Sequence, residues 1–291
     1  MKIKEILQES IKQLKANEVE EPHAKARRLL AFTLEVPKEY LIINYDKEIS
    51  KKQETIYKQY IKNLLEGEPI QYILGKQEFM GIEFAVNKDV LIPQPDTEIL
   101  VEEVIKLLKQ YKKPKILDLC TGSGAIAISI SEKVSEAQIY ASDISEKALA
   151  IARINDRSKK IKFILSDLFN NIEDKFDIIV SNPPYIKTHE IEKLSKEVQN
   201  EPILALDGGI DGLEFYRKII GQASKYIKKN GYLCLEIGEE QKKQVKDIIN
   251  NKKKYADIKE YKDLNKNDRV IICKKTWKNH KKTCINLRYM I

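Results

Sequence analysis

The sequence has few cysteines and histidines, and their spacing excludes several kinds of site. Its four cysteines lie far apart and include no C-x-x-C pair: Cys120, Cys234, Cys273 and Cys284. Zinc sites and disulfide frameworks need closer or patterned spacing, so we expect reduced thiols. The three histidines are also scattered, without the pattern of a catalytic triad or a metal cluster. We therefore expect no metal ion.

Long apolar runs are missing as well. No stretch reaches the roughly 18 apolar residues of a membrane-spanning helix. Residues 1–15 lack the apolar core and cleavage site of a secretory signal. The spacing of Ile3, Ile6 and Leu7 predicts an amphipathic helix there instead. Hydrophobic residues make up 42% and charged residues 33%, which is typical of a soluble globular protein. We expect a cytoplasmic protein without membrane contact.

The net charge of +8 is unevenly distributed. Residues 274–291 hold six basic residues and no acid, and so carry most of this charge: Lys274, Lys275, Lys278, Lys281, Lys282 and Arg288. A basic stretch of this kind is compatible with contacts to RNA, but a solvated terminus is the simpler interpretation. We predict a disordered basic tail over residues 276–291 and no stable binding of nucleic acid.

Residues 1–75 predict a small bundle of helices. Pro22 suits the first turn of a helix, and Ser50 with Gln53 forms a capping-box pattern before another. Gly67 is placed to end that second helix. Such short helices are stable only when they pack together. We expect residues 1–75 to form an all-helical domain.

Residues 76–96 change character and predict a linker built on a β-hairpin. Phe84 and Val86 alternate with period two, and Pro93 and Pro95 then prevent any regular element. From residue 97 to 275, strands and helices alternate. The candidate strands are 115–119, 138–142, 161–165, 176–181, 232–237, 256–261 and 270–274. Helical patterns include 125–134, 145–155 and 213–230.

This alternation predicts an α/β domain with a mostly parallel sheet covered by helices on both faces. The last two candidate strands are separated only by the short segment 263–269. A parallel crossover needs about a dozen residues, so this pair should be antiparallel. Seven strands with a final antiparallel pair resemble the class I methyltransferase (Rossmann-like) fold.

A glycine-rich loop follows the strand predicted at 115–119. Gly122 and Gly124 allow a tight turn and a close approach to a ligand, and the next helix begins there. The spacing to Ala127 also satisfies the dinucleotide fingerprint, so the loop alone does not identify the ligand. A turn without a ligand stays open. The loop residues that we expect at a cofactor are Asp118, Cys120, Thr121, Gly122, Ser123 and Gly124.

Two further strand ends carry acids. Asp143 follows the strand at 138–142 and can accept hydrogen bonds from both ribose hydroxyls of an adenosine cofactor. Both NAD and S-adenosylmethionine carry that ribose, and a helix-capping role is the alternative. Asp167 and Leu168 follow the strand at 161–165, where they would border an adenine ring. An ordinary loop is equally compatible with these two residues.

The most specific motif is Asn182-Pro183-Pro184-Tyr185, at the end of the strand at 176–181. Its two prolines fix the backbone and remove two N–H donors, which leaves nearby carbonyls free to accept hydrogen bonds. Asn182 adds a side-chain carbonyl, and Tyr185 adds a flat aromatic surface. Two acceptors beside a slot complement a planar –NH₂ group. The alternative is a rigid turn.

This motif resembles the signature of amino- and amide-nitrogen methyltransferases. In them the Asn side chain and the first Pro carbonyl hold the target nitrogen, and the Tyr packs against the substrate. The stretches 92–98, 200–206 and 263–270, with the helical N-terminal domain, are similar to the release-factor glutamine methyltransferases (the HemK/PrmC family). In that family the N-terminal domain helps to dock the release factor. The resemblance covers residues 1–274 and is strongest from 90 to 210.

The resemblance implies methyl transfer from S-adenosylmethionine to the glutamine amide nitrogen in the Gly-Gly-Gln motif of class 1 peptide chain release factors, modulating translation termination. It implies catalytic roles for Asn182, Pro183 and Tyr185, substrate contacts from these residues and Pro184, and cofactor contact from Asn182. A ribosomal-protein glutamine methyltransferase and a nucleic-acid amino-group methyltransferase remain alternatives. A non-catalytic adaptor that senses cofactor is a third, and a turnover assay distinguishes it.

The sequence departs from the family pattern at two positions. Gln94 stands where the family usually has Arg, and so supplies no cation there. Cys120 stands where the cofactor loop more often has Gly. We expect Cys120 to be tolerated on the condition that its backbone avoids positive φ.

Overall fold

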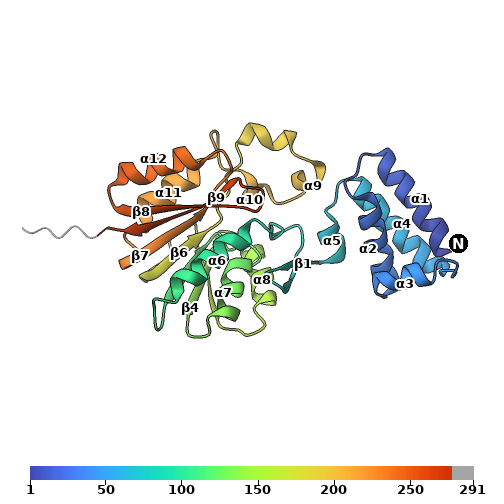
Figure 1. Cartoon of the computed structure of the whole chain (residues 1–291), viewed down its shortest axis with the longest axis horizontal. Coiled ribbons are helices and arrows are strands. Elements are labelled where there is room, and N and C mark those ends of the chain that lie inside the picture. The colour runs from blue at the N-terminus through green and yellow to red at the C-terminus, as the bar shows by residue number, and fades with distance from the viewer. Residues whose placement is uncertain (277–291) are drawn as a thin grey trace, which may run out of the picture.

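The computed structural model describes residues 1–276 as an N-terminal helical bundle beside a larger α/β unit (Figure 1). The helices are α1 (Ile3–Ala16), α2 (Pro22–Leu34), α3 (Lys38–Ile43), α4 (Lys51–Leu65), α5 (Ile70–Leu74), α6 (Thr97–Leu108), α7 (Ala125–Lys133), α8 (Glu146–Asn155), α9 (Lys196–Gln199), α10 (Ile203–Leu206), α11 (Glu214–Ala223), α12 (Lys242–Lys252) and the 3₁₀ helix η1 (Thr188–Lys193). The strands are β1 (Lys76–Phe79), β2 (Ile82–Ala85), β3 (Lys115–Leu119), β4 (Gln138–Asp143), β5 (Ile161–Leu165), β6 (Phe176–Ser181), β7 (Ile227–Glu236), β8 (Tyr255–Lys262) and β9 (Asp268–Lys275). The tail expected at 276–291 lies, apart from its first residue, outside the described residues.

Helices α1–α5 pack around a core of their own. Ile6, Leu14 and Leu29 are fully buried there, and Tyr57 joins them while its hydroxyl donates to a backbone carbonyl of α2. The signals in the sequence act as expected, because α2 begins at Pro22 and α4 has a complete capping box. No helix among residues 1–276 is both long enough and apolar enough to cross a membrane.

The large sheet has the order β5-β4-β3-β6-β7-β9-β8. The first five strands are parallel, whereas β9 runs antiparallel to both β7 and β8. The predicted seven-stranded methyltransferase sheet and its final antiparallel pair are confirmed. The strand order reverses between β3 and β6, which is the topological switch point of the sheet. These two strands are neighbours, so the loops that follow them lie together at one edge.

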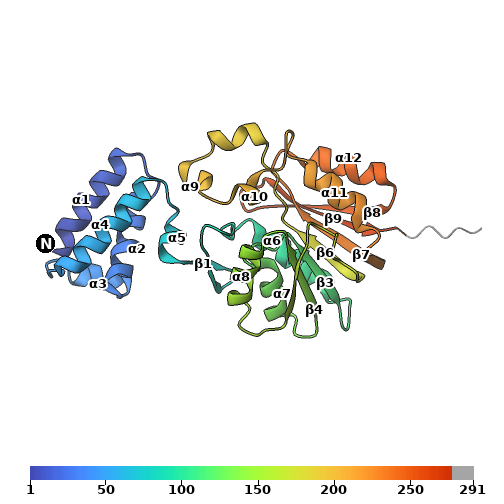
Figure 2. The same ribbon diagram turned by 180° about the vertical axis from the view of Figure 1, so that it is seen from behind.

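Helices cover both faces of this sheet (Figures 1 and 2). Alternate residues of each strand point to opposite sides, so β3 contributes Leu117 to one core and Ile116 to the other. The first core lies under α11 and α12 and includes Tyr216 and Ile219. The second lies under α6 and α7 and includes Val101. Burial on both sides fixes the register of the strands and therefore the positions of the loops at their ends.

One helix is shorter than its sequence pattern predicts. The helical pattern at 213–230 ends at Ala223, and β7 starts at Ile227. Tyr226 explains the difference, because its ring stacks on Phe169 at 4.6 Å and its carbonyl accepts from the Phe176 amide at 2.7 Å. These contacts are distant in sequence and outweigh the local helical preference.

The segment that carries α9 joins the bundle to the α/β unit, and both views place it between them (Figures 1 and 2). Lys25 of α2 forms a partly buried ion pair with Glu197 of α9. The Asn200 amide donates to the carbonyl of Gly67 at 2.9 Å. We call residues 195–206 the bridging segment, since its later residues reach the functional cavity described next.

Candidate active site

A cavity of about 360 Å³ opens at the carboxyl ends of β3, β4, β5 and β6. It is within the size range of sites for small molecules and cofactors. Its lining consists of Lys88, Asp89, Val90, Leu91, Cys120, Gly122, Ser142, Asp143, Ile144, Ser145, Ala148, Ser166, Asp167, Leu168, Asn182, Pro184, Pro202, Leu204, Ala205, Phe215 and Lys218. Seven of the residues singled out in the sequence therefore line this one cavity, and they come from four different strand ends.

The glycine-rich loop contributes Cys120 and Gly122 to the lining. A Cβ on Gly122 would meet no atom of residues 1–276 within 4 Å, whereas one on Gly124 would lie 2.9 Å from Ile128. Cys120 has φ +61°, so the condition that we set for it fails. The loop needs a left-handed residue at that position, which explains why glycine is more usual there.

Asp118, Thr121, Ser123 and Gly124 do not line the cavity. Asp118 is fully buried beneath the loop, where its carboxylate accepts from the Thr121 hydroxyl at 2.6 Å and from the Ala127 amide at 3.2 Å. Burial raises the pKa of Asp118 to about 7. This carboxyl group holds the loop against the start of α7, and it acts on the cavity only through the loop.

Asp143 lies in the lining and also supports the loop. One carboxylate oxygen accepts from the Gly122 amide and the other from the Ser145 amide, each at 2.9 Å. Burial raises the pKa of Asp143, although these two N–H groups oppose the shift. Ser145 itself caps α8 by accepting from the Ala148 amide, so that role is already filled. Each oxygen of Asp143 keeps a second lone pair for a ligand.

Asp167 and Leu168 form the wall beyond β5. Leu168 adopts φ +47°, and the Ser166 hydroxyl donates to its carbonyl at 2.8 Å. A leucine held in this unusual conformation indicates that the surrounding structure determines the position of its side chain. Across the lining, Ile144 is 52% exposed although apolar. The two side chains offer apolar surfaces to a flat ring.

The Asn182–Tyr185 motif contributes Asn182 and Pro184 to the lining, but not Pro183 or Tyr185. The Asn182 amide nitrogen donates to the Thr97 hydroxyl at 3.2 Å. Tyr185 is held behind the cavity, where Gln241 donates to its carbonyl at 2.9 Å. Gly212 permits this packing, because a Cβ there would lie 2.4 Å from the same carbonyl.

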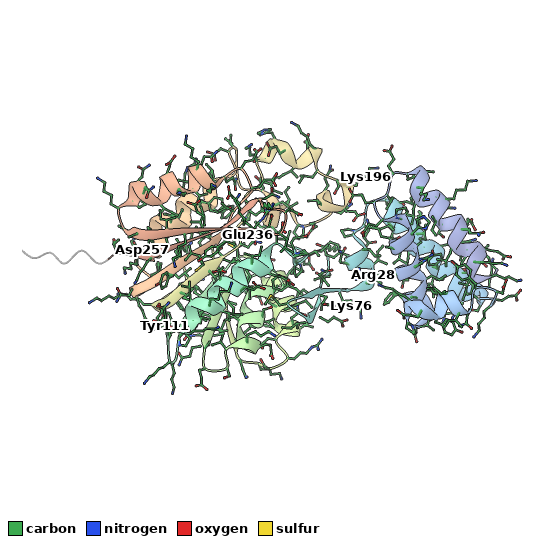
Figure 3. The ribbon with its side chains drawn as sticks, viewed as in Figure 1. Arg28, Lys76, Tyr111, Lys196, Glu236 and Asp257 are labelled. Atoms are coloured by element: carbon green, nitrogen blue, oxygen red, sulfur yellow. The ribbon has the colours of Figure 1, made fainter. Side chains whose placement is uncertain are left out.

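A buried polar cluster lies behind the motif. Glu236 ends β7 and is 1% exposed, and Figure 3 places it at the end of the sheet that faces the bundle. Arg269 of β9 pairs with Asp263 at 3.0 Å and with Asp96 at 3.1 Å. Burial raises the pKa of the Tyr185 hydroxyl, and the positive charge of Arg269 opposes that shift. Neither Glu236 nor Thr97 is among the site residues predicted from the sequence.

Sequence reasoning also missed several lining residues. Val90 and Leu91 precede the prolines of the linker, and Pro202 and Leu204 belong to the bridging segment. Phe215 comes from α11. None of these follows a parallel strand, which was the signal used to find the others. Glu236 did carry that signal, because it is an acid at the end of a buried strand.

Comparison with known proteins matches two family models to this chain. The PrmC N-terminal domain matches residues 5–75, and the methyltransferase small domain matches residues 95–265. The second match alone covers more than half of the chain. Both ranges agree with the division between the helical bundle and the α/β unit.

Curated relatives match over nearly the whole length. A release factor glutamine methyltransferase of Clostridium acetobutylicum is 40% identical over 280 residues, which cover 94% of this chain and 98% of that protein. A release factor glutamine methyltransferase of Thermodesulfovibrio yellowstonii is 42% identical over 259 residues, covering 87% and 92%. Among solved structures, a methyltransferase from Pyrococcus furiosus is similar with a TM-score of 0.50 and 20% identity, covering 68% of this chain and 90% of that one. That likeness concerns the fold alone.

Proposed function

The chain belongs to the release factor glutamine methyltransferase family, and on that premise we propose that it methylates the glutamine side chain in the Gly-Gly-Gln motif of class 1 peptide chain release factors. One observation supports this activity above the others. Asn182 lines the cavity, and its side-chain NH₂ donates a hydrogen bond to the Thr97 hydroxyl. Its side-chain carbonyl oxygen is therefore left for a ligand. A carbonyl oxygen is the group that binds the –NH₂ of a glutamine side chain.

The cofactor is S-adenosylmethionine, and the cavity fits it. We propose that Asp143 accepts from the ribose hydroxyls and that Ile144 and Leu168 enclose the adenine, since all three residues line the cavity. The open space beside Gly122 leaves room for the amino-acid part against the loop. When bound, the cofactor supplies a methyl group that leaves sulfur without its bonding electrons, as the glutamine nitrogen forms the new bond and loses a proton to water.

The residues of this chain act mainly by holding the glutamine amide. An amide nitrogen is a poor nucleophile because its lone pair is shared with the carbonyl group. We propose that the Asn182 side-chain carbonyl and the Pro183 backbone carbonyl accept its two N–H groups. They thereby align the nitrogen and stabilise the positive charge that grows on it. Pro184 and Tyr185 keep this part of the backbone in place.

We propose a division of labour along the chain. Residues 1–75 dock the release factor, 76–96 link, and 97–275 carry the cofactor and the chemistry. The match of the PrmC N-terminal domain to residues 5–75 and the separate core of the bundle support this division. Because the substrate is a translation factor, we place the reaction in the cytoplasm.

The test is labelled methyl transfer to purified release factors, ribosomal proteins, tRNA and DNA in parallel. The modified residue is then mapped by mass spectrometry. We expect label on the Gly-Gly-Gln glutamine of a release factor. Label on a ribosomal-protein glutamine or on a nucleic-acid base would replace the proposed substrate, and the absence of any turnover would favour an adaptor.

A further inference from the structure

Three residues that are far apart in sequence meet behind the cavity. In the register of the sheet, Ser181 of β6 pairs with Leu235 of β7. Since the two strands are parallel, the next residues, Asn182 and Glu236, lie at the same level: Asn182 follows the end of β6, and Glu236 is still paired with Val270 of β9. Thr97 begins α6 and is only 5% exposed. The sheet register and the start of α6 thus bring an amide, a hydroxyl and a carboxyl group together.

The hydrogen bonds among them have a direction. The Asn182 amide nitrogen donates to the Thr97 oxygen at 3.2 Å. A hydroxyl that accepts one bond still has its own hydrogen to donate. Burial dominates the pKa of the Glu236 carboxyl group, and hydrogen bonding by the Thr97 and Asn182 side chains opposes its effect. The Thr97 hydrogen can therefore go to Glu236, which continues the direction from Asn182 to Thr97.

Glu236 is an unusual residue to bury unless it accepts hydrogen bonds. Its Oε2 has no hydrogen-bond partner among the residues that the structure describes. The charged groups that act on it are Arg269 and Asp96, and Arg269 is already paired with Asp96 and Asp263. A buried carboxyl group that is only partly satisfied costs folding free energy, and such costs persist where function requires them.

We propose that Thr97 and Glu236 are positioning residues that hold the Asn182 side chain with its carbonyl oxygen toward the substrate amide. Rotation of the Asn182 amide by 180° would present an NH₂ group to the NH₂ group of the glutamine, and no hydrogen bond would form. An ionised Glu236 prevents this rotation, because a carboxylate only accepts: it takes the Thr97 hydrogen, and the Thr97 oxygen is then left to accept from the Asn182 amide. The inference rests on the proposed function, and it gives a role to Thr97 in the stretch 92–98.

The test compares close variants of the full chain. Thr97→Val keeps the shape of the side chain and removes the hydroxyl, whereas Thr97→Ser keeps the hydroxyl. We expect Thr97→Val and Glu236→Gln each to lower kcat about 10- to 100-fold, with the Kd for S-adenosylmethionine little changed, and Thr97→Ser to stay near the parent chain. Ser129→Ala is the matched control, because Ser129 of α7 is a buried hydroxyl that has no hydrogen-bond partner in the described part of the chain.

A double-mutant cycle separates positioning from general support. If Thr97 acts through Asn182, Thr97→Val should have little further effect in an Asn182→Ala background. Additive losses in that cycle, or full activity in Thr97→Val, would overturn the proposal. The side-chain amide resonances of Asn182, followed by NMR, give a readout without turnover. If the parent chain methylates no release factor, the proposed function is wrong. Unchanged Asn182 resonances in Thr97→Val and Glu236→Gln would separately refute the positioning role.

Discussion

Asn182→Ala is the most direct test of the proposed chemistry. The substitution removes one of two acceptors proposed for the glutamine amide and leaves the loop at Gly122 and its bond to Asp143 untouched. Deleting one preorganised polar partner at a reacting centre typically costs about 2.7–4 kcal/mol, or roughly 10²–10³ in rate. We therefore expect kcat/KM for a release factor to fall by about that factor.

The assay should separate binding from chemistry. Single-turnover transfer of labelled methyl gives the rate, and calorimetry gives the Kd for S-adenosylmethionine, which should change less than about threefold, or about 0.7 kcal/mol. Asn182→Asp keeps an acceptor oxygen, but it loses the donor to Thr97 and adds a carboxyl group beside Glu236. Its activity should lie between those of the parent chain and the alanine variant. Full activity of Asn182→Ala would mean that the prolines shape the slot alone, and the mechanism would be wrong.

Four further outcomes are expected. Asp143→Ala should weaken cofactor binding at least about tenfold in calorimetry, since two charge-assisted hydrogen bonds are lost, and an unchanged Kd would leave Asp143 as a loop support only. A chain that begins at residue 77 should still bind cofactor and methylate a short Gly-Gly-Gln peptide, but its activity on an intact release factor should fall at least about tenfold, because a docking interface is deleted. Equal losses of activity on the two substrates would make the bundle a structural support. Cys120→Gly should stabilise the protein by about 0.5–1 kcal/mol in urea unfolding, because the relief of positive φ exceeds the added chain entropy, and a loss of stability would contradict this. Burial raises the pKa of Glu236 from its usual 4.5 to about 7. The folding stability linked to this group is therefore complete below pH 4.5 and is lost as the pH rises through 7. Glu236→Gln should flatten that part of the plot of unfolding free energy against pH, and an unaltered slope would argue against the raised pKa.

The sequence was most informative where burial dominates. The β3 and β6 strands were predicted at their observed bounds, because short apolar runs buried on both faces have few alternatives. The same reasoning located the loops after β3, β4, β5 and β6, which form the cavity. The carboxyl ends of parallel strands lie at the same edge of a sheet, so a residue at such an end can be assigned to a site before the fold is known.

Prediction failed where distant contacts decide. Ala223 ends a helix because Tyr226 is captured by Phe169 and Phe176, and the local pattern contains no sign of this. The positive φ of Cys120 is required by the loop, although cysteine itself gives no hint of it. Thr97 was missed because its contact with Asn182 exists only once α6 has packed beside β6, whereas Glu236 carried the strand-end signal and was overlooked.

The bridging segment has a consequence for the order of binding events. Its first part forms the ion pair with Lys25 and the hydrogen bond to Gly67, while Pro202 and Leu204 line the cavity. The bundle and the cavity therefore contact opposite ends of one short stretch of chain. Any shift of that stretch by one ligand changes the affinity for the other, and thermodynamic reciprocity makes the two changes equal in free energy. Measured in both directions, the two coupling energies must agree.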